Sequence, residues 1–274
     1  MKSHYLLLIY IFSIFSITNC YLLSDFFDNK FSDTYQSYNT QNDTLTFDNM
    51  LSLWSESYLR KVQPDYQDTI NFQLRDNNQY YYIVFNNRSF KIFKERNYNS
   101  KITVIADFKT YSKIFNGELS PQTAAGRSSM RKPAPLDFKL ENGMTYQKID
   151  WERAYLILIN FFNHHPHNKI VIKKEYSREI HSGNAIGLYY SKGYRSAYYF
   201  IDKADTLNKN GESDPYEQSI IIVKGTGFAK IGSDTLVINE NEAYHIRPNI
   251  EHKIWTNSND GISLLWSAWG EKVW

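Results

Sequence analysis

The sequence predicts two domains, an N-terminal α+β domain and a C-terminal all-β domain of the double-sheet, jelly-roll type. The chain has 274 residues, which is enough for two domains that each bury a core of their own. Within residues 46–145, apolar side chains recur first at helical spacing and then in short strand-like runs. Within residues 175–274, short strand-like runs alternate with turn residues, which favours a sandwich or barrel.

Composition argues against some classes of partner. The chain carries 31 basic and 29 acidic residues, a net charge of +2, without a long run of one sign. Neither nucleic-acid binding nor binding to an anionic membrane surface is therefore expected. Because Cys20 is the single cysteine, an internal disulfide is excluded and the fold must depend on packing.

Residues 1–20 are predicted to be a cleaved secretory signal. Lys2 precedes an apolar run over residues 5–17, which is too short to cross a bilayer comfortably. The residues that end at Cys20 resemble a loose bacterial lipobox, whose cysteine becomes lipidated, and a simple signal with an unmodified Cys20 is the alternative. Residues 21–45 are rich in small polar residues and are predicted to be a flexible tether. The protein is thus expected to be secreted or associated with the cell envelope, with membrane contact only through a lipid anchor.

Residues 46–145 are predicted to form the α+β domain. A helix is expected after the candidate N-cap Thr46, where apolar residues recur at helical spacing. A second, short helix is expected to begin after the N-cap Asp107 and to end at Asn116-Gly117. Strands are expected over residues 69–74, 79–85, 89–93 and 102–105.

The strand, short helix and turn that lead into residues 117–126 resemble a segment of the sterol carrier protein 2 (SCP2) family. Gly117, Leu119, Pro121 and Ala124 fit the family's glycine-x-leucine-x-proline turn and the helix after it. The resemblance implies an SCP2-like antiparallel sheet with helices, around an apolar tunnel for a fatty acyl chain or sterol. An ordinary aromatic core is the alternative for the same residues.

Residues 146–174 are predicted to hold a bridging helix and a His-rich loop. The helix is expected over residues 149–162, where apolar residues gather on one side. The loop His164-His165-Pro166-His167 brings three imidazoles together, but Pro166 stiffens the turn and adjacent side chains diverge. We interpret it as a loop that ends the helix, and not as a metal site.

Within residues 175–274, strands are predicted over 220–223, 228–231 and 235–238, the last two joined by a hairpin turn at 232–234. The turns that follow resemble the second motif of the cupin family. Asn241 and Asn249 stand at the two glycines of that motif, and His252 stands at its histidine. Asparagine tolerates the positive φ that such turns need. The resemblance implies a cupin-type jelly-roll barrel.

The first cupin motif is altered at its metal ligands. Glu212 and Asp214 stand where the family has its pair of histidines, and Gln218 stands at the glutamate. Alternate residues of a strand share a face, so these side chains could converge with His252 inside the barrel. The resemblance therefore implies a carboxylate-rich site for a divalent metal such as Fe, Mn, Mg or Ca. The alternative is a set of polar groups that lines the barrel mouth without a metal.

Two functions are consistent with these observations. In the first, the protein is an exported small-molecule-binding protein, whose N-terminal domain takes a lipid- or sterol-like ligand. In the second, the barrel is a metal-dependent enzyme, an oxygenase, an isomerase or a related enzyme, with Tyr216 and Glu217 as ligand contacts near its mouth. Loss of the histidine pair, without another general base, favours the first. No catalytic residue is assigned, and a homodimer is expected only because barrels of this kind often pair.

Overall fold

The computed structural model describes residues 45–127, 133–140, 148–164 and 169–271, and residues from Thr46 onward belong to one compact unit. The predicted signal, Cys20 and all but the last residue of the tether lie outside the described residues, as do His165 and His167. Among the described residues, no helix combines the length and apolar character needed to span a membrane.

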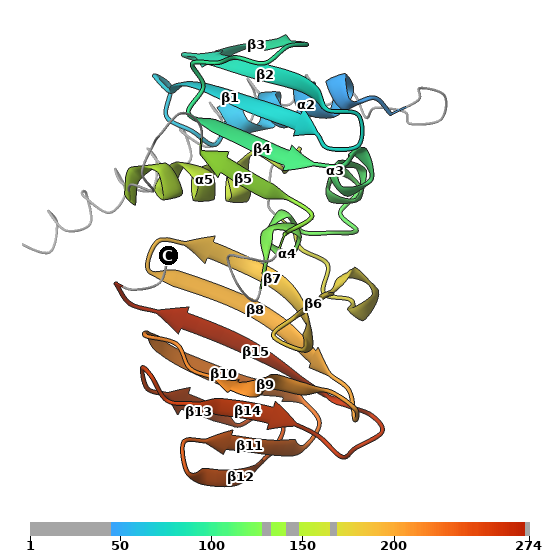
Figure 1. Ribbon diagram of the computed structural model, residues 1–274, viewed down its shortest axis with the longest axis vertical. Helices are drawn as coiled ribbons and strands as arrows, with labels where there is room; N and C mark the ends of the chain where they lie inside the picture. Colours follow the sequence, from blue (N-terminus) through green and yellow to red (C-terminus); the bar gives the residue numbers. More distant parts are fainter. Residues whose placement is uncertain (1–44, 128–132, 141–147, 165–168, 272–274) are drawn as a thin grey trace, which may run out of the picture. The chain divides into compact units, whose positions relative to one another are not determined.

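The N-terminal domain is a five-stranded sheet with the order β3-β2-β1-β4-β5 (Figure 1). Its strands are β1 (Gln67–Leu74), β2 (Gln79–Asn86), β3 (Ser89–Phe93), β4 (Ile102–Ala106) and β5 (Asp137–Leu140). Three of the four pairings are antiparallel, as predicted, whereas β1 and β4 are parallel. The β2–β3 hairpin occupies one edge of β1, and residues 94–101 lead back so that β4 joins the other edge.

In the described part of the chain, this sheet is accompanied by the helices α2 (Phe47–Leu59), α3 (Phe108–Phe115), α4 (Pro121–Ala125) and α5 (Lys148–Asn160). The predicted N-caps are confirmed, because Thr46 accepts a hydrogen bond from the backbone of Asn49 and Asp107 accepts one from the backbone of Thr110. Ser120 caps the five-residue α4 in the same way, and Pro121 takes the first helical position.

Aromatic rings fill the space between the helices and the sheet. The fully buried Trp54 of α2 contacts the rings of Phe115, Phe161 and Phe162. Phe161 in turn contacts Phe72 of β1 at 5.0 Å between ring centroids. The sequence left two alternatives for this interior, an apolar tunnel or an aromatic core. The rings of the described residues pack together as an aromatic core.

The C-terminal domain consists of two antiparallel sheets (Figure 1). The larger has the order β13-β10-β15-β8-β7-β6 and the smaller β12-β11-β14-β9. The larger sheet contains β6 (Arg178–Ile180), β7 (Gly183–Ser191), β8 (Tyr194–Ile201), β10 (Glu217–Lys224), β13 (Ala243–Ile246) and β15 (Ile262–Trp269). The smaller contains β9 (Thr206–Glu212), β11 (Gly227–Ile231), β12 (Asp234–Ile238) and β14 (His252–Trp255), and a 3-10 helix, η2 (Lys174–Tyr176), precedes β6.

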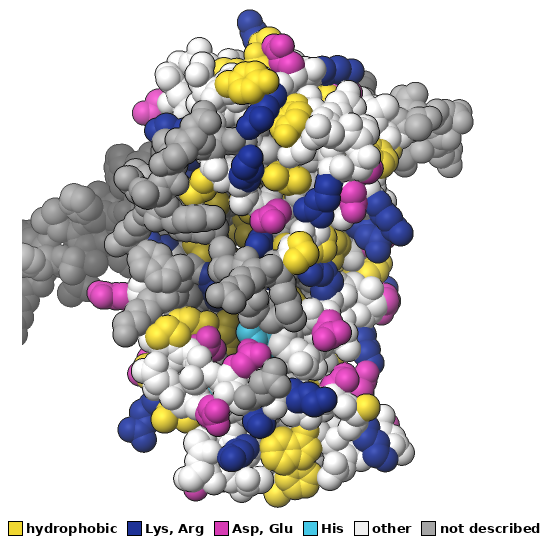
Figure 2. Space-filling model, in the orientation of Figure 1, with side chains coloured by type: hydrophobic (Ala, Val, Ile, Leu, Met, Phe, Trp, Pro, Cys, Tyr) yellow, Lys and Arg dark blue, Asp and Glu magenta, His cyan; other side chains and the backbone are white. Residues whose placement is uncertain are grey.

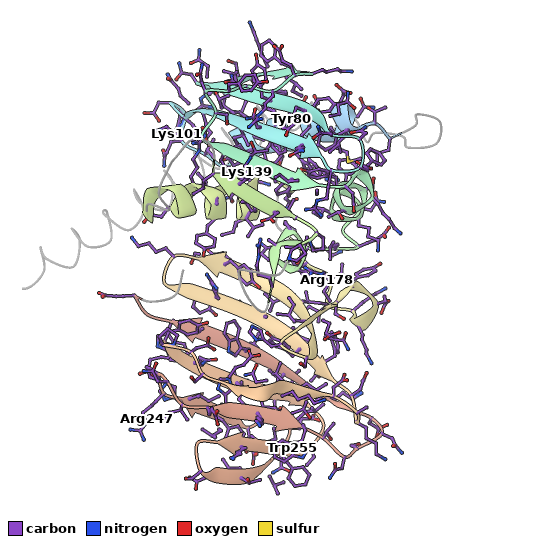
Figure 3. All side chains as sticks on the ribbon, in the orientation of Figure 1. Tyr80, Lys101, Lys139, Arg178, Arg247 and Trp255 are labelled. Carbon is purple, nitrogen blue, oxygen red and sulfur yellow. The ribbon has the colours of Figure 1, made fainter. Side chains whose placement is uncertain are left out.

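Apolar side chains of both sheets form one core, which includes Ile220 and Ile222 of β10, Ile254 of β14 and Leu264 of β15. On the outside of the smaller sheet, Phe228 and Trp255 stack with ring centroids 5.7 Å apart. Trp255 is labelled in Figure 3, and hydrophobic side chains gather in the same region of the surface in Figure 2. The double-sheet prediction is therefore confirmed.

Closure into a barrel, which the cupin resemblance implied, is not found among the described strands. Asn208 in β9 has a φ of 56°, which interrupts the extended backbone. At this point β9 meets the β6–β7 turn through a hydrogen bond from the backbone N–H of Asn208 to the carbonyl of His181, 2.9 Å long. The predicted turns are confirmed, because Asn241 and Asn249 have φ of 67° and 63°.

Helix α4 packs against β6 and β7. The N–H of Gly187 donates to the Thr123 hydroxyl at 2.9 Å, and the Ser120 hydroxyl donates to the carbonyl of Gly187 at 2.9 Å. Nη1 of Arg178, labelled in Figure 3, lies 2.7, 3.0 and 3.0 Å from the carbonyl oxygens of Thr123, Ala124 and Gly126. The guanidinium therefore satisfies the carbonyls at the end of this short helix.

Candidate functional site

The C-terminal domain contains a hollow of about 70 Å³, bordered by residues of both sheets. Four of the residues predicted for the site line it: Asp214, Tyr216, Gln218 and His252. They come from β10, β14 and the connection between β9 and β10, so sheet pairing brings together residues that are far apart in the sequence.

Gln218 lies on the inward face of β10, because side chains alternate along a strand and Ile220 and Ile222 are buried on the same face. Only 1% of its surface is exposed. Its Oε1 accepts a hydrogen bond of 2.7 Å from Nε1 of Trp266. Because an indole N–H can only donate, this bond fixes the amide orientation. Nε2 of Gln218 is then a buried donor without an acceptor among the described residues.

His252 is 3% exposed and both of its ring nitrogens are engaged. Nδ1 lies 3.1 Å from the carbonyl oxygen of Ile250, which can only accept, so Nδ1 carries the proton. Nε2 lies 2.8 Å from Nδ2 of Asn208 and accepts from it. The lone pair that a metal ion would use is thus taken by the Asn208 amide.

The two predicted glutamates do not line the hollow. The carboxylate of Glu212 is in hydrogen-bond contact with Nδ1 of His181, and His181 lines the hollow whereas Glu212 does not. Glu217 precedes Gln218 on β10 and therefore faces the other side of the strand. Its Oε2 lies 2.8 Å from Nε2 of His245. Glu217, which the sequence predicted near the mouth, thus lies on the opposite face of β10 from Gln218 and is not part of the lining.

Arg195 of β8 is a residue of the hollow that the sequence motifs did not identify. Its Nη2 donates a 2.8 Å hydrogen bond to the Tyr155 hydroxyl of α5. Its guanidinium carbon lies 5.7 Å from the ring centroid of Tyr190, which also lines the hollow. Nε of Arg195 is buried and has no acceptor among the described residues. No described carboxylate forms an ion pair with this guanidinium.

Two further phenols line the hollow besides Tyr190, as does Arg127, whose Nη2 donates to Asp137 at 2.7 Å. Burial raises the pKa of Tyr199, and the negative charges of Asp214 and Glu212 raise it further. Burial also raises the pKa of Tyr216, with the charge of Asp214 and a hydrogen bond to that carboxylate as further causes. Both phenols therefore remain protonated at neutral pH and can donate hydrogen bonds.

This set of donors does not fit a divalent metal ion. Asp214 contributes the one carboxylate of the lining, Nε2 of His252 is occupied, and Arg195 and Gln218 present N–H groups that repel a cation. In the part of the chain that the structure describes, no three His, Cys, Asp or Glu side chains are grouped as metal ligands. The residues that resemble an altered cupin motif are thus polar, but in the described structure they do not form a metal-binding arrangement.

A larger cleft, of about 620 Å³, lies beside the N-terminal domain. Its wall includes the end of α3, the turn into α4, the end of α5, residues 169–176 and β7. Apolar side chains from these elements line it, among them Ile114, Phe115, Leu119, Phe162, Ile186 and Leu188. Lys169 and Lys173, both exposed, also border the cleft. Phe115 and Phe162 therefore belong both to the aromatic core and to the wall of the cleft.

Comparison with known proteins supports the SCP2 resemblance. Residues 47–129 match the model of the SCP-2 sterol transfer family. The N-terminal domain is SCP-2-like. A comparison with curated proteins found no match.

Solved structures similar to this chain include a cupin 2 conserved barrel domain protein from Salinispora arenicola, with 10% identity, a TM-score of 0.33, and coverage of 38% of this chain and 91% of that chain. An RmlC-like cupin from Shewanella frigidimarina has 12% identity, a TM-score of 0.31, and coverage of 37% of this chain and 91% of that chain. The fold of the C-terminal domain is itself given by its strand pairings.

Proposed function

We propose that this protein binds an apolar small molecule in the cleft beside its SCP-2-like domain. The observation that carries the proposal is a cleft of about 620 Å³ with a largely apolar wall. Ligand sites for small molecules commonly have volumes of about 300–1,000 Å³ and walls of this kind. The match of residues 47–129 to a sterol transfer family supports an apolar ligand independently.

The lining favours a ligand with an apolar body and an anionic end. Phe115 and Phe162 on one side, and Ile186 and Leu188 of β7 on the other, offer apolar contact. Each methylene group of a bound chain that leaves water contributes about 0.8 kcal/mol. The bordering lysines are suitable partners for a carboxylate that stays near solvent. A fatty acid has this distribution of groups.

The test is displacement of a fluorescent fatty acid, together with native mass spectrometry of protein purified from its own organism. Leu188→Glu places a carboxylate in the apolar wall and should weaken fatty-acid binding about tenfold or more. Leu236→Glu is the matched control, because Leu236 is 37% exposed on β12 and does not line the cleft. Equal affinities of the two variants, or no binding by the wild-type protein, would contradict the proposal.

Export is part of the same proposal, and the composition of residues 1–20 supports it. N-terminal sequencing of the mature protein should begin at or after Cys20. Incorporation of radiolabelled lipid that is lost in Cys20→Ala would identify a lipoprotein. A mature chain that retains Cys20 unmodified would identify a simple secretory signal, and one that retains residues 1–20 would refute export by a cleaved signal.

A further inference from the structure

We infer that the hollow of the C-terminal domain binds a small organic carboxylate, held by Arg195 and Gln218. Nε of Arg195 and Nε2 of Gln218 are buried donors with no acceptor among the described residues, and Gln218 is 1% exposed. Buried donors are satisfied in nearly all proteins, so two of them at one hollow indicate an acceptor that the chain itself does not supply. Because one of the two belongs to a guanidinium, an anionic acceptor fits best.

Sheet register places the two donors on one face of the larger sheet. Gln218 of β10 pairs with Ala268 of β15, and Ala268 pairs with Arg195 of β8. Directly paired residues point to the same face, so Gln218, Ala268 and Arg195 form one row across three strands. Two strand spacings separate Gln218 from Arg195, which is roughly 10 Å between their Cα atoms. Only the methyl group of Ala268 stands between them, and this leaves room for a ligand.

The neighbours of the row prevent either donor from turning away. Nε1 of Trp266 donates a hydrogen bond to Oε1 of Gln218, so the amide cannot rotate by half a turn and put Nε2 in the place of Oε1. Tyr155 binds Nη2 of Arg195 on one side, and the ring of Tyr190 lies beside the guanidinium. The two donors are therefore held in place before a ligand binds, which reduces the entropy lost on binding.

Asp214 defines the class of carboxylate more closely. It lines the same hollow and would repel a ligand that presented only negative charge there. A hydroxyl or ammonium group next to the carboxylate would instead donate to Asp214. The hollow, at about 70 Å³, has room for roughly five water-sized groups. Short hydroxy acids and amino acids such as lactate and alanine have both the size and the groups required.

The experiment is isothermal titration of the full chain with lactate, alanine, propionate and the uncharged lactamide. Lactate or alanine should bind, propionate more weakly, and lactamide at least about tenfold more weakly, because the amide lacks the charge that pairs with Arg195. Gln218→Glu should abolish binding, since its carboxylate can keep the Trp266 bond and occupy the position in front of Arg195. Ser219→Ala, on the opposite face of the same strand, should bind as the wild type does.

Urea unfolding and far-UV circular dichroism of the same variants show whether Gln218→Glu folds. A folded Gln218→Glu variant that binds lactate as well as wild type refutes the inference. So does equal binding of lactate and lactamide, or no heat with any of the four probes, because water alone would then satisfy the two donors. Stoichiometric uptake of Fe²⁺ or Mn²⁺ that is lost in His252→Ala would also overturn it. None of these outcomes depends on the apolar cleft, so failure here leaves the proposed function untouched.

Discussion

Replacement of Gly187 by alanine is expected to destabilise the fold by about 2–4 kcal/mol. A Cβ atom at this position would lie 2.9 Å from the carbonyl carbon and from Cβ of Gln122, and 3.0 Å from the backbone nitrogen of Thr123. These atoms belong to the backbone and first side-chain carbon of α4, so no side-chain rotation can move them away. Either α4 or β7 must shift.

Two terms contribute to this magnitude. Inserting a methyl group into a packed interface costs about 1–3 kcal/mol. The shift also lengthens two hydrogen bonds, from Gly187 N to the Thr123 hydroxyl and from the Ser120 hydroxyl to the Gly187 carbonyl, both 2.9 Å long. Each contributes about 1 kcal/mol. The two terms together amount to about 3–5 kcal/mol, and relaxation of the short helix reduces the expected loss to about 2–4 kcal/mol.

The assay is urea unfolding followed by far-UV circular dichroism, with the free energy of unfolding extrapolated to water. Gly117→Ala is the comparison, because Gly117 has a φ of 73° but nothing within 4 Å of the added Cβ. That variant should lose only about 1 kcal/mol, from backbone conformation alone. If Gly187→Ala loses no more than Gly117→Ala, the close contact between α4 and β7 is refuted.

Two further predictions concern groups away from the ligand sites. Arg178→Met should lower the free energy of unfolding by about 2–4 kcal/mol, because three carbonyls at the end of α4 share the two hydrogens of Nη1. Arg178→Lys should recover part of this loss in the same urea assay. A loss below about 0.5 kcal/mol in Arg178→Met would contradict this role of the guanidinium. Burial raises the pKa of Tyr58 from 10.0 to about 12, so the folded state keeps a proton that the unfolded chain releases. The stability from this group is present below pH 10 and is lost as the pH rises toward 12. Tyr58→Phe should therefore flatten the alkaline fall in unfolding free energy, and an unchanged slope would refute the assignment.

Local signals in the sequence were sufficient for much of the fold. The N-caps Thr46 and Asp107 act on backbone N–H groups three residues away, so a short segment contains the whole interaction. The same holds for Asn241 and Asn249, whose positive φ follows from the turn itself. The parallel pairing of β1 with β4 is different, because it depends on the path of residues 94–101 and has no local sequence signal.

The candidate site was likewise predictable only where a local sequence signal existed. Motif spacing identified Gln218 and His252, because His252 begins β14 just after the turn at Asn249, and Gln218 stands near the start of β10. Arg195 was missed because both faces of β8 carry aromatic residues: Tyr194, Tyr198 and Phe200 alternate with Arg195, Ala197 and Tyr199. Alternation alone cannot tell which face is inside when neither is clearly polar.

Small residues leave room for a side chain or a helix to approach at two places in this fold, and such places are hard to predict from sequence. Ala268 keeps space between Gln218 and Arg195, although those residues are neighbours only through the register of β10, β15 and β8. Gly187 likewise admits α4 against β7, where a side chain would meet the backbone of the helix. In each case what matters is that the side chain is small or absent, at a position that comes beside its partners only in the folded protein. A pattern of periodicity or spacing along the chain cannot contain that information, whereas the pairing of strands supplies it directly.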